Sequence, residues 1–290
     1  IIYLSSIGEY RRIYLPAYNC PSFVKKLRDT KISLKFYNYS NKLSLSDDLI
    51  ENLDEKDIVI LNNLYGIMDT RINKDIAKLK SKGVRTIADC AHSIACKTLS
   101  NASAYSPRKF LAISDGGILE TKTLLNIENL EEDPNTSSRM SYLNLRSKGK
   151  IREGYELFLK SEKQLSRSNP AKMSKLTKEI LLNSELEDKL KKRKENFHFL
   201  HFQLKYCNEL TEIIQSNKIS SPLYYPLLVT NGREIRSRLI NEKIFIPIFW
   251  DYIKNESLNI LEKKLKSDCV LIPIDHRWSQ KDMIRILNVI

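Results

Sequence analysis

The stretch VRTIADCAHSIACKTLSNASAYSPRKFLAISDGG, residues 84–117, decides the fold. It opens with residues 84–88, for which we predict a buried β-strand, and this strand leads directly into Asp89. A carboxylate in such a position is costly to bury unless a cationic group accompanies it. Farther along, the stretch carries Lys109 and then a Gly116-Gly117 turn that leads into another apolar strand. These features predict a charged site at one edge of a sheet.

The first 125 or so residues alternate between strand and helix patterns. Strands are expected at 12–15, 33–39, 57–61 and 84–88, and helices at 22–28, from Ser46 onward, and at 72–82. Gly83 stands where a helix C-terminal cap is expected. This alternation predicts a mostly parallel sheet covered by helices, in three α/β/α layers. Ligands of such sheets bind beyond the carboxyl ends of the strands, where Asn63 and Asp89 stand.

The second half of the chain has a different pattern. Residues 120–150 are polar, and we expect an irregular, mobile loop there, whereas residues 151–206 are helical in pattern with a break at 168–170. Strands at 224–229, 244–250 and 270–273, with helices at 233–241 and 280–289, predict a smaller α/β domain. We therefore predict a large domain over residues 1–180 and a small C-terminal domain over residues 181–290.

Composition places the chain among globular proteins, with 42% hydrophobic and 29% charged residues. No apolar run reaches the ~20 residues of a membrane-spanning helix. The five cysteines are scattered and form no C-x-x-C pair, which argues against a disulfide framework and against a zinc site. The four histidines are equally dispersed. These patterns predict a cytoplasmic protein without a metal site and without a membrane span.

The formal net charge of +13 is open to two interpretations. One is a lysine-rich solvated surface, and the other is a polyanionic partner such as nucleic acid or a phosphorylated ligand. The richest basic run, residues 189–194, is interleaved with acidic residues, which is typical of an exposed helix. Because no basic motif with interleaved aromatic residues is visible, we expect no nucleic-acid partner. A charge-driven nucleic-acid binder, with steep salt dependence, remains an alternative.

Three motifs in the deciding stretch occur together in a known group of enzymes. D-x-A-H at residues 89–92, S-x-x-K at 106–109 and the Gly-Gly pair at 116–117 resemble the fold-type-I enzymes that use pyridoxal 5′-phosphate (PLP). The closest resemblance is to the DegT/DnrJ/StrS sugar aminotransferases. It implies an aspartate-aminotransferase-like large domain, with a smaller C-terminal α/β domain.

Weaker similarities extend this resemblance over most of the chain. LPAYNC at residues 15–20 resembles the family's strand followed by P-x-Y-T-F, and NLYG at 63–66 resembles its H-x-Y-G loop. The segment from residue 225 to residue 247 resembles its small domain.

The resemblance also implies a role for each matching residue. Lys109 would hold PLP as a Schiff base and act as the acid and base of the proton shift. Asp89 would pair with the protonated ring nitrogen and keep the cofactor an electron sink. The other expected contacts are His92 with the 3-hydroxyl group, Ser106 with the phosphate, Asn63 with the 3-hydroxyl group or the substrate, and Tyr18 or Cys20 with the ring face.

The chain departs from the family pattern in three respects. Asp89 and Lys109 are 20 residues apart, a shorter spacing than is usual in the family. Cys20 stands where an aromatic residue usually stacks on the ring. The S-G-x-x-A phosphate loop is absent, and residues 1–7 resemble the end of the helix that follows it, so we expect the loop to precede residue 1.

The activity implied by the resemblance is transfer of an amino group from an amino acid, glutamate being favoured, to a keto substrate. A nucleotide-linked keto sugar for surface-polysaccharide synthesis is the favoured acceptor, and a homodimer is expected. The alternatives are a truncated or non-catalytic homologue acting as a binding protein, and a PLP-dependent lyase. A desulfurase-type lyase would need a loop cysteine, which residues 120–150 lack. Arg277 could bind a substrate carboxylate, but an ion pair with Asp275 is favoured.

Overall fold

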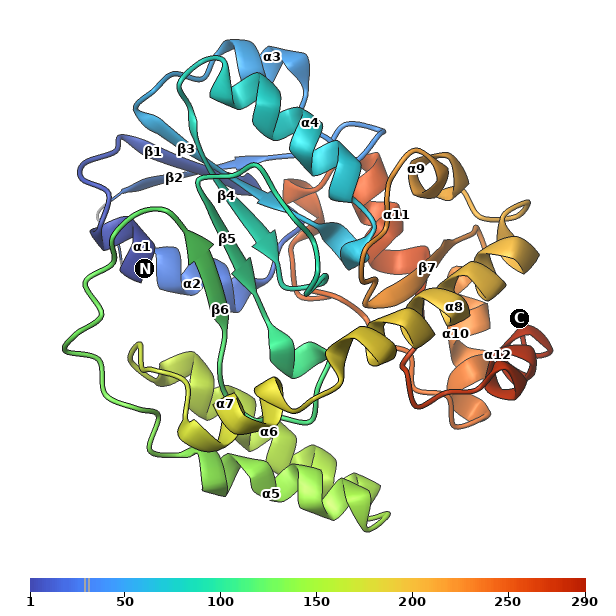
Figure 1. Ribbon diagram of the computed structural model, residues 1–290. Helices are drawn as coiled ribbons and strands as arrows, with labels where there is room; N and C mark the ends of the chain where they lie inside the picture. The colour runs from blue at the N-terminus through green and yellow to red at the C-terminus, as the bar shows by residue number, and fades with distance from the viewer. Residues whose placement is uncertain (29, 31) are drawn as a thin grey trace.

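The computed structural model (Figure 1) describes residues 1–28, 30 and 32–290 of the chain. Its first half alternates strands with helices, as the sequence predicts. The elements are α1 (Ile2–Ser5), β1 (Arg12–Pro16), α2 (Pro21–Arg28), β2 (Ser33–Tyr37), α3 (Asp47–Glu51), β3 (Asp57–Asn62), α4 (Asp69–Lys80), β4 (Arg85–Cys90), β5 (Ala102–Tyr105) and β6 (Ile118–Thr121), with 3-10 turns η1 (Leu64–Gly66) and η2 (Pro107–Lys109).

These strands form one six-stranded sheet in the order β2-β1-β3-β4-β5-β6. Neighbouring strands are parallel except at the edge, where β6 runs antiparallel to β5. The predicted α/β class with a mostly parallel sheet is therefore confirmed. Parallel pairing also brings the strand ends to one edge, so that Asn62 of β3 lies beside Asp89 of β4.

Strand β3 shows how the layers are built, because all six of its residues are buried. Alternate side chains of a strand point to opposite faces of its sheet. Ile58 and Ile60 pack in one cluster with Leu4 of α1 and Leu27 of α2. Val59 and Leu61 belong to the other cluster, together with Ile72, Ile76 and Leu79 of α4. Helices thus cover both faces of the sheet, as the three-layer prediction requires (Figure 1).

The second half is mostly helical and contains a separate two-stranded sheet in which β7 and β8 are antiparallel. Its elements are α5 (Thr136–Ser147), α6 (Ile151–Arg167), α7 (Lys175–Leu182), α8 (Leu186–Leu204), α9 (Thr211–Gln215), β7 (Tyr224–Leu228), α10 (Gly232–Asn241), η3 (Asn255–Ser257), α11 (Ile260–Asp268), β8 (Cys269–Pro273) and α12 (Gln280–Leu287). The predicted break in the helical segment after residue 167 is confirmed. Among the described residues, no helix combines the length and the apolar character needed to cross a membrane.

The prediction of an irregular loop over residues 120–150 is wrong, because residues 136–147 form α5. Polar side chains fix this helix through buried contacts. The side chain of Arg139, only 1% exposed, forms an ion pair with Asp133, and the Thr136 hydroxyl donates to the Asp115 carboxylate. These polar contacts, together with the buried Tyr142 that packs edge to face on Phe158 of α6, hold α5 in place.

The predicted strand at residues 244–250 is also wrong. Ile244 and Ile246 are buried, and this spacing suggested a half-buried strand. However, Lys243 and Trp250 have φ values of +61° and +55°, which no strand residue adopts, and Pro247 has no N–H to donate to a neighbouring strand. The segment is an irregular turn that carries two aromatic residues, Phe249 and Trp250.

The predicted division after residue 180 stays a prediction. Residues 180 and 181 both lie inside α7. The largest cluster of buried apolar side chains runs from Tyr18 and Leu61 beside the six-stranded sheet to Ile272 of β8 and Ile286 of α12. The two sheets therefore share one core.

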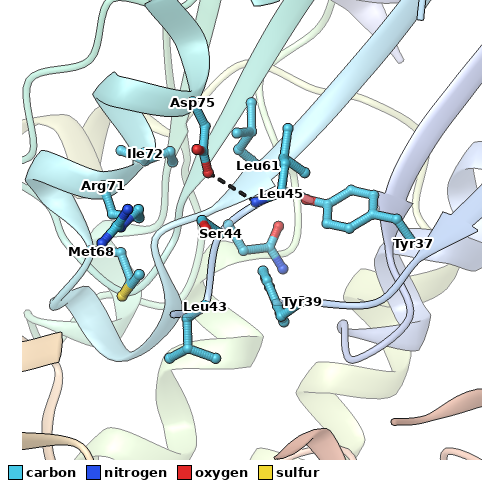
Figure 2. A pocket seen from close by; sticks show the side chains of 11 residues that line it. Tyr37, Tyr39, Leu43, Ser44, Leu45, Leu61, Met68, Arg71, Ile72 and Asp75 are labelled. Carbon is cyan, nitrogen blue, oxygen red and sulfur yellow. Dashed lines mark hydrogen bonds between the residues drawn. The ribbon is translucent and has the colours of Figure 1, made fainter. Parts of the chain in front are cut away.

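One buried carboxylate next to this core makes the stability of the protein depend on pH. Asp75 of α4 is 5% exposed, and its only described hydrogen bond comes from the backbone N–H of Leu45, at 3.1 Å (Figure 2). Tyr37, Leu61 and Ile72 surround it around a cavity of about 10 Å³, the space of a single water molecule. Burial raises the pKa of Asp75 to about 6 from its ordinary value of 3.8.

A raised carboxylate pKa means that the folded state binds the proton more tightly than the unfolded state. The free energy of unfolding therefore falls as pH rises from 3.8 to about 6, by up to about 3 kcal/mol from this group. We expect Asp75→Asn to raise stability above pH 6 by up to that amount and to change little below pH 4. Urea unfolding at several pH values checks this, and equal effects at pH 4 and pH 8 would contradict it.

Candidate active site

The site lies where β3, β4 and β5 end. Asp89 is the penultimate residue of β4, and its carbonyl oxygen accepts from the backbone N–H of Asn63 at 2.9 Å. Strand β5 ends at Tyr105, and the turn η2 then carries Lys109. Because β4 and β5 are adjacent and parallel, Asp89 and Lys109 emerge at the same edge of the sheet.

The Asp89 carboxylate is desolvated and only partly satisfied. One of its oxygens, Oδ1, accepts from the backbone N–H of Ala91 at 2.9 Å. Among the described residues, no cation lies within ion-pair distance of it. Burial raises its pKa, while the charge of Lys109 and the bond from Ala91 partly offset that effect. This carboxylate is therefore able to accept a further positively charged hydrogen-bond donor.

Lys109 is held by the backbone of a proline-initiated turn. Its N–H donates to the carbonyl of Ser106 at 3.1 Å, and Pro107 begins the turn. Solvent reaches the Lys109 side chain, yet the protein around it still desolvates the ammonium group and lowers its pKa. The charge of Asp89 acts in the opposite direction, and both Asp89 and Cys20 lie near the amine.

The same turn is tied to the helical part of the chain. Arg108, next to Lys109, forms an ion pair with Glu162 of α6 at 2.6 Å. Phe110, on the other side of Lys109, lies beneath the buried Arg193 guanidinium, 5.1 Å from its ring centre. Arg193 is in turn paired with Asp275 at 2.9 Å. Both neighbours of Lys109 are thus anchored, so its backbone position is fixed.

His92 is a neutral hydrogen-bond donor. It is 7% exposed, and its Nδ1 accepts from the backbone N–H of Tyr65 at 3.2 Å. An accepting Nδ1 leaves the proton of a neutral imidazole on Nε2. Burial and the charge of Lys109 hold the pKa of His92 well below its ordinary value of 6.5. The ring therefore stays uncharged near neutral pH and can donate from Nε2.

Aromatic rings from the second half of the chain cover His92. Phe249 stacks on it with ring centres 5.0 Å apart, and Trp250 lies 6.0 Å away with the planes only 19° from parallel. Tyr18 meets Trp250 edge to face at 4.7 Å, and its hydroxyl donates to the carbonyl of Phe249. Sequence reasoning placed Phe249 and Trp250 in a strand and missed this role, although two adjacent aromatic residues after Pro247 were a usable signal.

The structure distributes the remaining predicted site residues differently. Cys20 precedes α2, with its sulfur 3.0 Å from the Ser22 hydroxyl, and it lies near Lys109. Ser106 is the N-cap residue just before the turn η2, and its hydroxyl makes no described capping bond. The amide of Asn63, by contrast, is used locally. It donates to Asp69 at 2.6 Å and accepts from the N–H of Met68 at 2.8 Å.

The loop after β3 approaches His92 so closely that it requires a glycine. Gly66 has φ +80°, and a Cβ atom there would overlap the carbonyl oxygen of His92 and lie 3.0 Å from the Cα of Pro222. Tyr65, the preceding residue, also has a positive φ of 57°. This close approach keeps the Tyr65 N–H at the His92 ring.

We expect Gly66→Ala to lower the free energy of unfolding by roughly 2–4 kcal/mol, because it combines backbone strain with backbone overlap. Gly8→Ala is the matched control: Gly8 has φ +77°, but no atom lies within 4 Å of the added methyl group. Urea unfolding of both variants separates the two contributions. Equal losses in the free energy of unfolding would show that overlap with the His92 carbonyl adds no destabilisation beyond the backbone strain.

The favoured interpretation of Arg277 is confirmed. Its Nε lies 2.7 Å from one oxygen of Asp275, and its second guanidinium nitrogen lies 3.1 Å from the other. Asp275 also binds Arg193, so it is shared between two arginines. A search of the described residues finds no cluster of three histidine, cysteine or acidic side chains suited to a metal ion.

Comparison with solved structures identifies proteins of the same fold. A DegT/DnrJ/EryC1/StrS aminotransferase from Brucella abortus matches with a TM-score of 0.64 and 14% identity, over 99% of this chain and 80% of that one. A putative sugar aminotransferase from Streptococcus pneumoniae, in its PMP form, gives 0.65 and 14% over 99% and 82%. Helicobacter pylori PseC, an aminotransferase involved in pseudoaminic acid biosynthesis, gives 0.60 and 13% over 97% and 79%.

No family model and no curated protein matches the sequence. The structural matches, at 13–14% identity, establish a shared fold over almost the whole chain. They confirm at the level of the fold the resemblance that the motifs around Asp89 and Lys109 suggest.

Proposed function

We propose that this chain, which has the fold of the DegT/DnrJ/EryC1/StrS aminotransferases, is a PLP-dependent aminotransferase. The observation that carries the proposal is the placement of Asp89 and Lys109 at one sheet edge, close enough for each to shift the pKa of the other. Shifted pKa values of two opposite charges at strand ends are typical of a catalytic site.

The residues present fit the cofactor. Asp89 offers a carboxylate with one described hydrogen bond, whose remaining acceptor capacity suits a protonated pyridine nitrogen. Lys109 offers an amine of lowered pKa within reach of solvent. His92 offers an uncharged Nε2–H, and the Ser106 hydroxyl makes no described capping bond. Asp89 would hold the ring nitrogen and Lys109 the reactive carbon. His92 would contact the 3-hydroxyl group and Ser106 the phosphate.

When bound, PLP supplies an electron sink that stabilises negative charge on the substrate carbon beside the amino group. Asp89 would keep the ring nitrogen protonated, because its own negative charge favours that proton. The Lys109 amine would take the proton from the substrate α-carbon and deliver it to the carbon on the other side of the substrate nitrogen. A lowered pKa suits this task, since more of the amine is in the free-base form near neutral pH than in an ordinary lysine.

Two aromatic residues, Phe249 and Trp250, supply aromatic packing in the site, which the small side chain of Cys20 cannot provide. Cys20 lies near Lys109, at the position where the resemblance expects an aromatic ring on the cofactor, and it contributes only a small side chain. Trp250 and Phe249 instead stack upon His92. We propose that they exclude water from that side of the site and keep the His92 ring in one orientation.

For the substrates we propose an amino acid donor, with glutamate favoured, and a keto sugar acceptor linked to a nucleotide. Several proteins of this fold are named as sugar aminotransferases, and this supports a sugar acceptor. The homodimer also stays a prediction. It is supported by an exposed apolar row on α6, formed by Ile151, Tyr155 and Leu159 at four-residue spacing.

The experiment that tests the proposal is an absorbance spectrum of the purified protein with PLP, followed by borohydride reduction and peptide mapping. We expect a visible band and a label fixed on Lys109. In a separate sample that has not been reduced, L-glutamate should discharge the band and yield an equivalent of 2-oxoglutarate. No band and an unlabelled Lys109 at saturating PLP would favour the alternative of a non-catalytic homologue that acts as a binding protein.

A further inference from the structure

A groove of about 650 Å³ lies along α4, outside the group of residues around Lys109. Its walls come from the first half of α4, from the loop between β4 and β5, and from the segment between α9 and β7. The lining residues are Asp69, Thr70, Asn73, Lys74, Ala77, Ala95, Lys97, Lys218 and Ser220. We call it the lysine groove. Its volume is that of sites for small molecules.

Each of the three walls contributes one lysine, Lys74, Lys97 and Lys218, and all three are exposed. Within the described part of the chain, no carboxylate lies within ion-pair distance of any of them. They differ in this respect from Lys78 on the same helix, which is paired with Asp47 at 2.7 Å. The groove therefore holds three positive charges without direct partners.

The one acidic residue in the lining, Asp69, already accepts hydrogen bonds with both carboxylate oxygens. One oxygen of the Asp69 carboxylate accepts from the Asn63 amide at 2.6 Å, and the other accepts from the N–H of Ser220 at 2.9 Å. Asp69 is 5% exposed, so it offers little surface to a ligand. Against three lysines it leaves a net formal charge of +2 on the lining.

The walls are fixed to one another by hydrogen bonds. The N–H of Lys218 donates to the Thr70 hydroxyl at 2.8 Å, and the amide of Asn73 donates to the carbonyl of Lys97 at 3.0 Å. The first bond joins α4 to the segment after α9, and the second joins α4 to the loop between β4 and β5. The three lysine backbones thus stand in a preformed arrangement, which lowers the entropic cost of binding a common ligand.

We propose that the lysine groove binds the phosphate groups of a phosphorylated small molecule, a diphosphate being the best match. Ammonium groups bind phosphate oxygens as point charges, and several converging on one anion are needed at a solvated site. The hydroxyl hydrogen of Thr70 is free to donate, because its oxygen already accepts from Lys218. The positive end of the α4 dipole lies at the same place.

This proposal stands apart from the proposed aminotransferase activity, since no lining residue belongs to the group around Lys109. One connection between the two regions exists. Asp69 holds the Asn63 amide, and the Asn63 backbone N–H donates to the carbonyl of Asp89. The binding test below needs neither PLP nor a substrate, so its failure and the failure of the aminotransferase proposal are distinguishable.

The test is isothermal titration of the full chain with pyrophosphate, comparing two triple variants of equal charge. One variant is Lys74→Gln, Lys97→Gln, Lys218→Gln. The control is Lys80→Gln, Lys122→Gln, Lys281→Gln, which removes three exposed lysines that lie outside the groove. We expect the groove variant to bind pyrophosphate about tenfold more weakly or worse, and the control variant to bind within about twofold of the native chain.

Hydrogen exchange gives a second readout of position. Pyrophosphate should slow amide exchange in residues 69–77 and 217–220 of the native chain and leave those segments unchanged in the groove variant. Equal weakening in both triple variants would show that only the overall charge matters and would overturn the proposal. Absence of binding to the native chain at millimolar pyrophosphate would also overturn it. Protection confined to residues 106–109 would assign the anion to the Lys109 region instead.

Discussion

Lys109→Ala is expected to lower the rate of amino transfer by roughly 10³-fold or more, because it removes both the attachment point and the group that moves the proton. Stability should hardly change. The described contacts include no hydrogen bond or ion pair of the Lys109 side chain, and substitutions at such exposed positions usually cost less than about 0.5 kcal/mol. The single-turnover rate with glutamate and the midpoint of urea unfolding together check this.

Lys122→Ala is the matched control, since Lys122 is also exposed and lies outside the site. It should keep full activity and the borohydride-fixed label on Lys109. A primary amine added to the Lys109→Ala variant should restore part of the proton-transfer rate, because it replaces the missing base. A Lys109→Ala variant that transfers amino groups at the native rate would exclude Lys109 from the reaction.

Asp89→Asn is expected to separate function from stability. The amide oxygen can still accept from the Ala91 N–H, but the negative charge beside the ring nitrogen is lost. Removing one preorganised electrostatic partner typically lowers a rate by roughly 10²–10³-fold. We therefore expect a loss of that size in amino transfer, together with weaker binding of PLP.

The stability of the PLP-free protein should change in the opposite direction. Burial raises the pKa of Asp89, so its ionised form is unfavourable in the folded state. The free energy of unfolding therefore falls as pH rises through that raised pKa. The Asp89→Asn variant should therefore unfold at a higher urea concentration than the native chain at pH 8, with the difference shrinking as pH falls.

Asp48→Asn, which changes an exposed carboxylate, is the control and should affect neither activity nor the pH dependence. If Asp89→Asn weakens PLP binding and also destabilises the PLP-free fold, Asp89 is a structural residue rather than a partner of the cofactor.

Much of the fold could be predicted from the sequence because it is encoded locally. The strand around Ile58 is an uninterrupted apolar run, and Gly83 marks the turn between α4 and the strand that contains Ala88, so the pattern of α4 and its flanking strands is present in the order of residues alone. Asp89 was identifiable because it stands at the end of a predicted strand, and Lys109 because its S-x-x-K motif follows D-x-A-H in the order seen in the resemblance. That the two emerge at one edge follows from the parallel pairing of β4 and β5.

What could not be predicted depends on side-chain contacts that no periodic pattern encodes. Helix α5 was expected as a loop because residues 120–150 are polar, and the contacts of Arg139 with Asp133 and of Thr136 with Asp115 become visible only in three dimensions. Asn63 stands at a strand end like Asp89, yet Asp69 and Met68 take up its amide. A turn residue's own neighbours decide whether its side chain is available to a ligand.

The sequence by itself indicated the alternation of strands and helices in the first half of the chain and pointed to Asp89 and Lys109 as candidates, because periodicity and short motifs are properties of short segments. The tertiary structure alone decided which residues surround that pair. Phe249 and Trp250 reach His92 across more than 150 residues of chain, through an irregular turn whose φ values no periodic pattern encodes. The lysine groove likewise exists only because three separate segments meet there. A single exposed lysine would not form an anion site, whereas three lysines around one groove can.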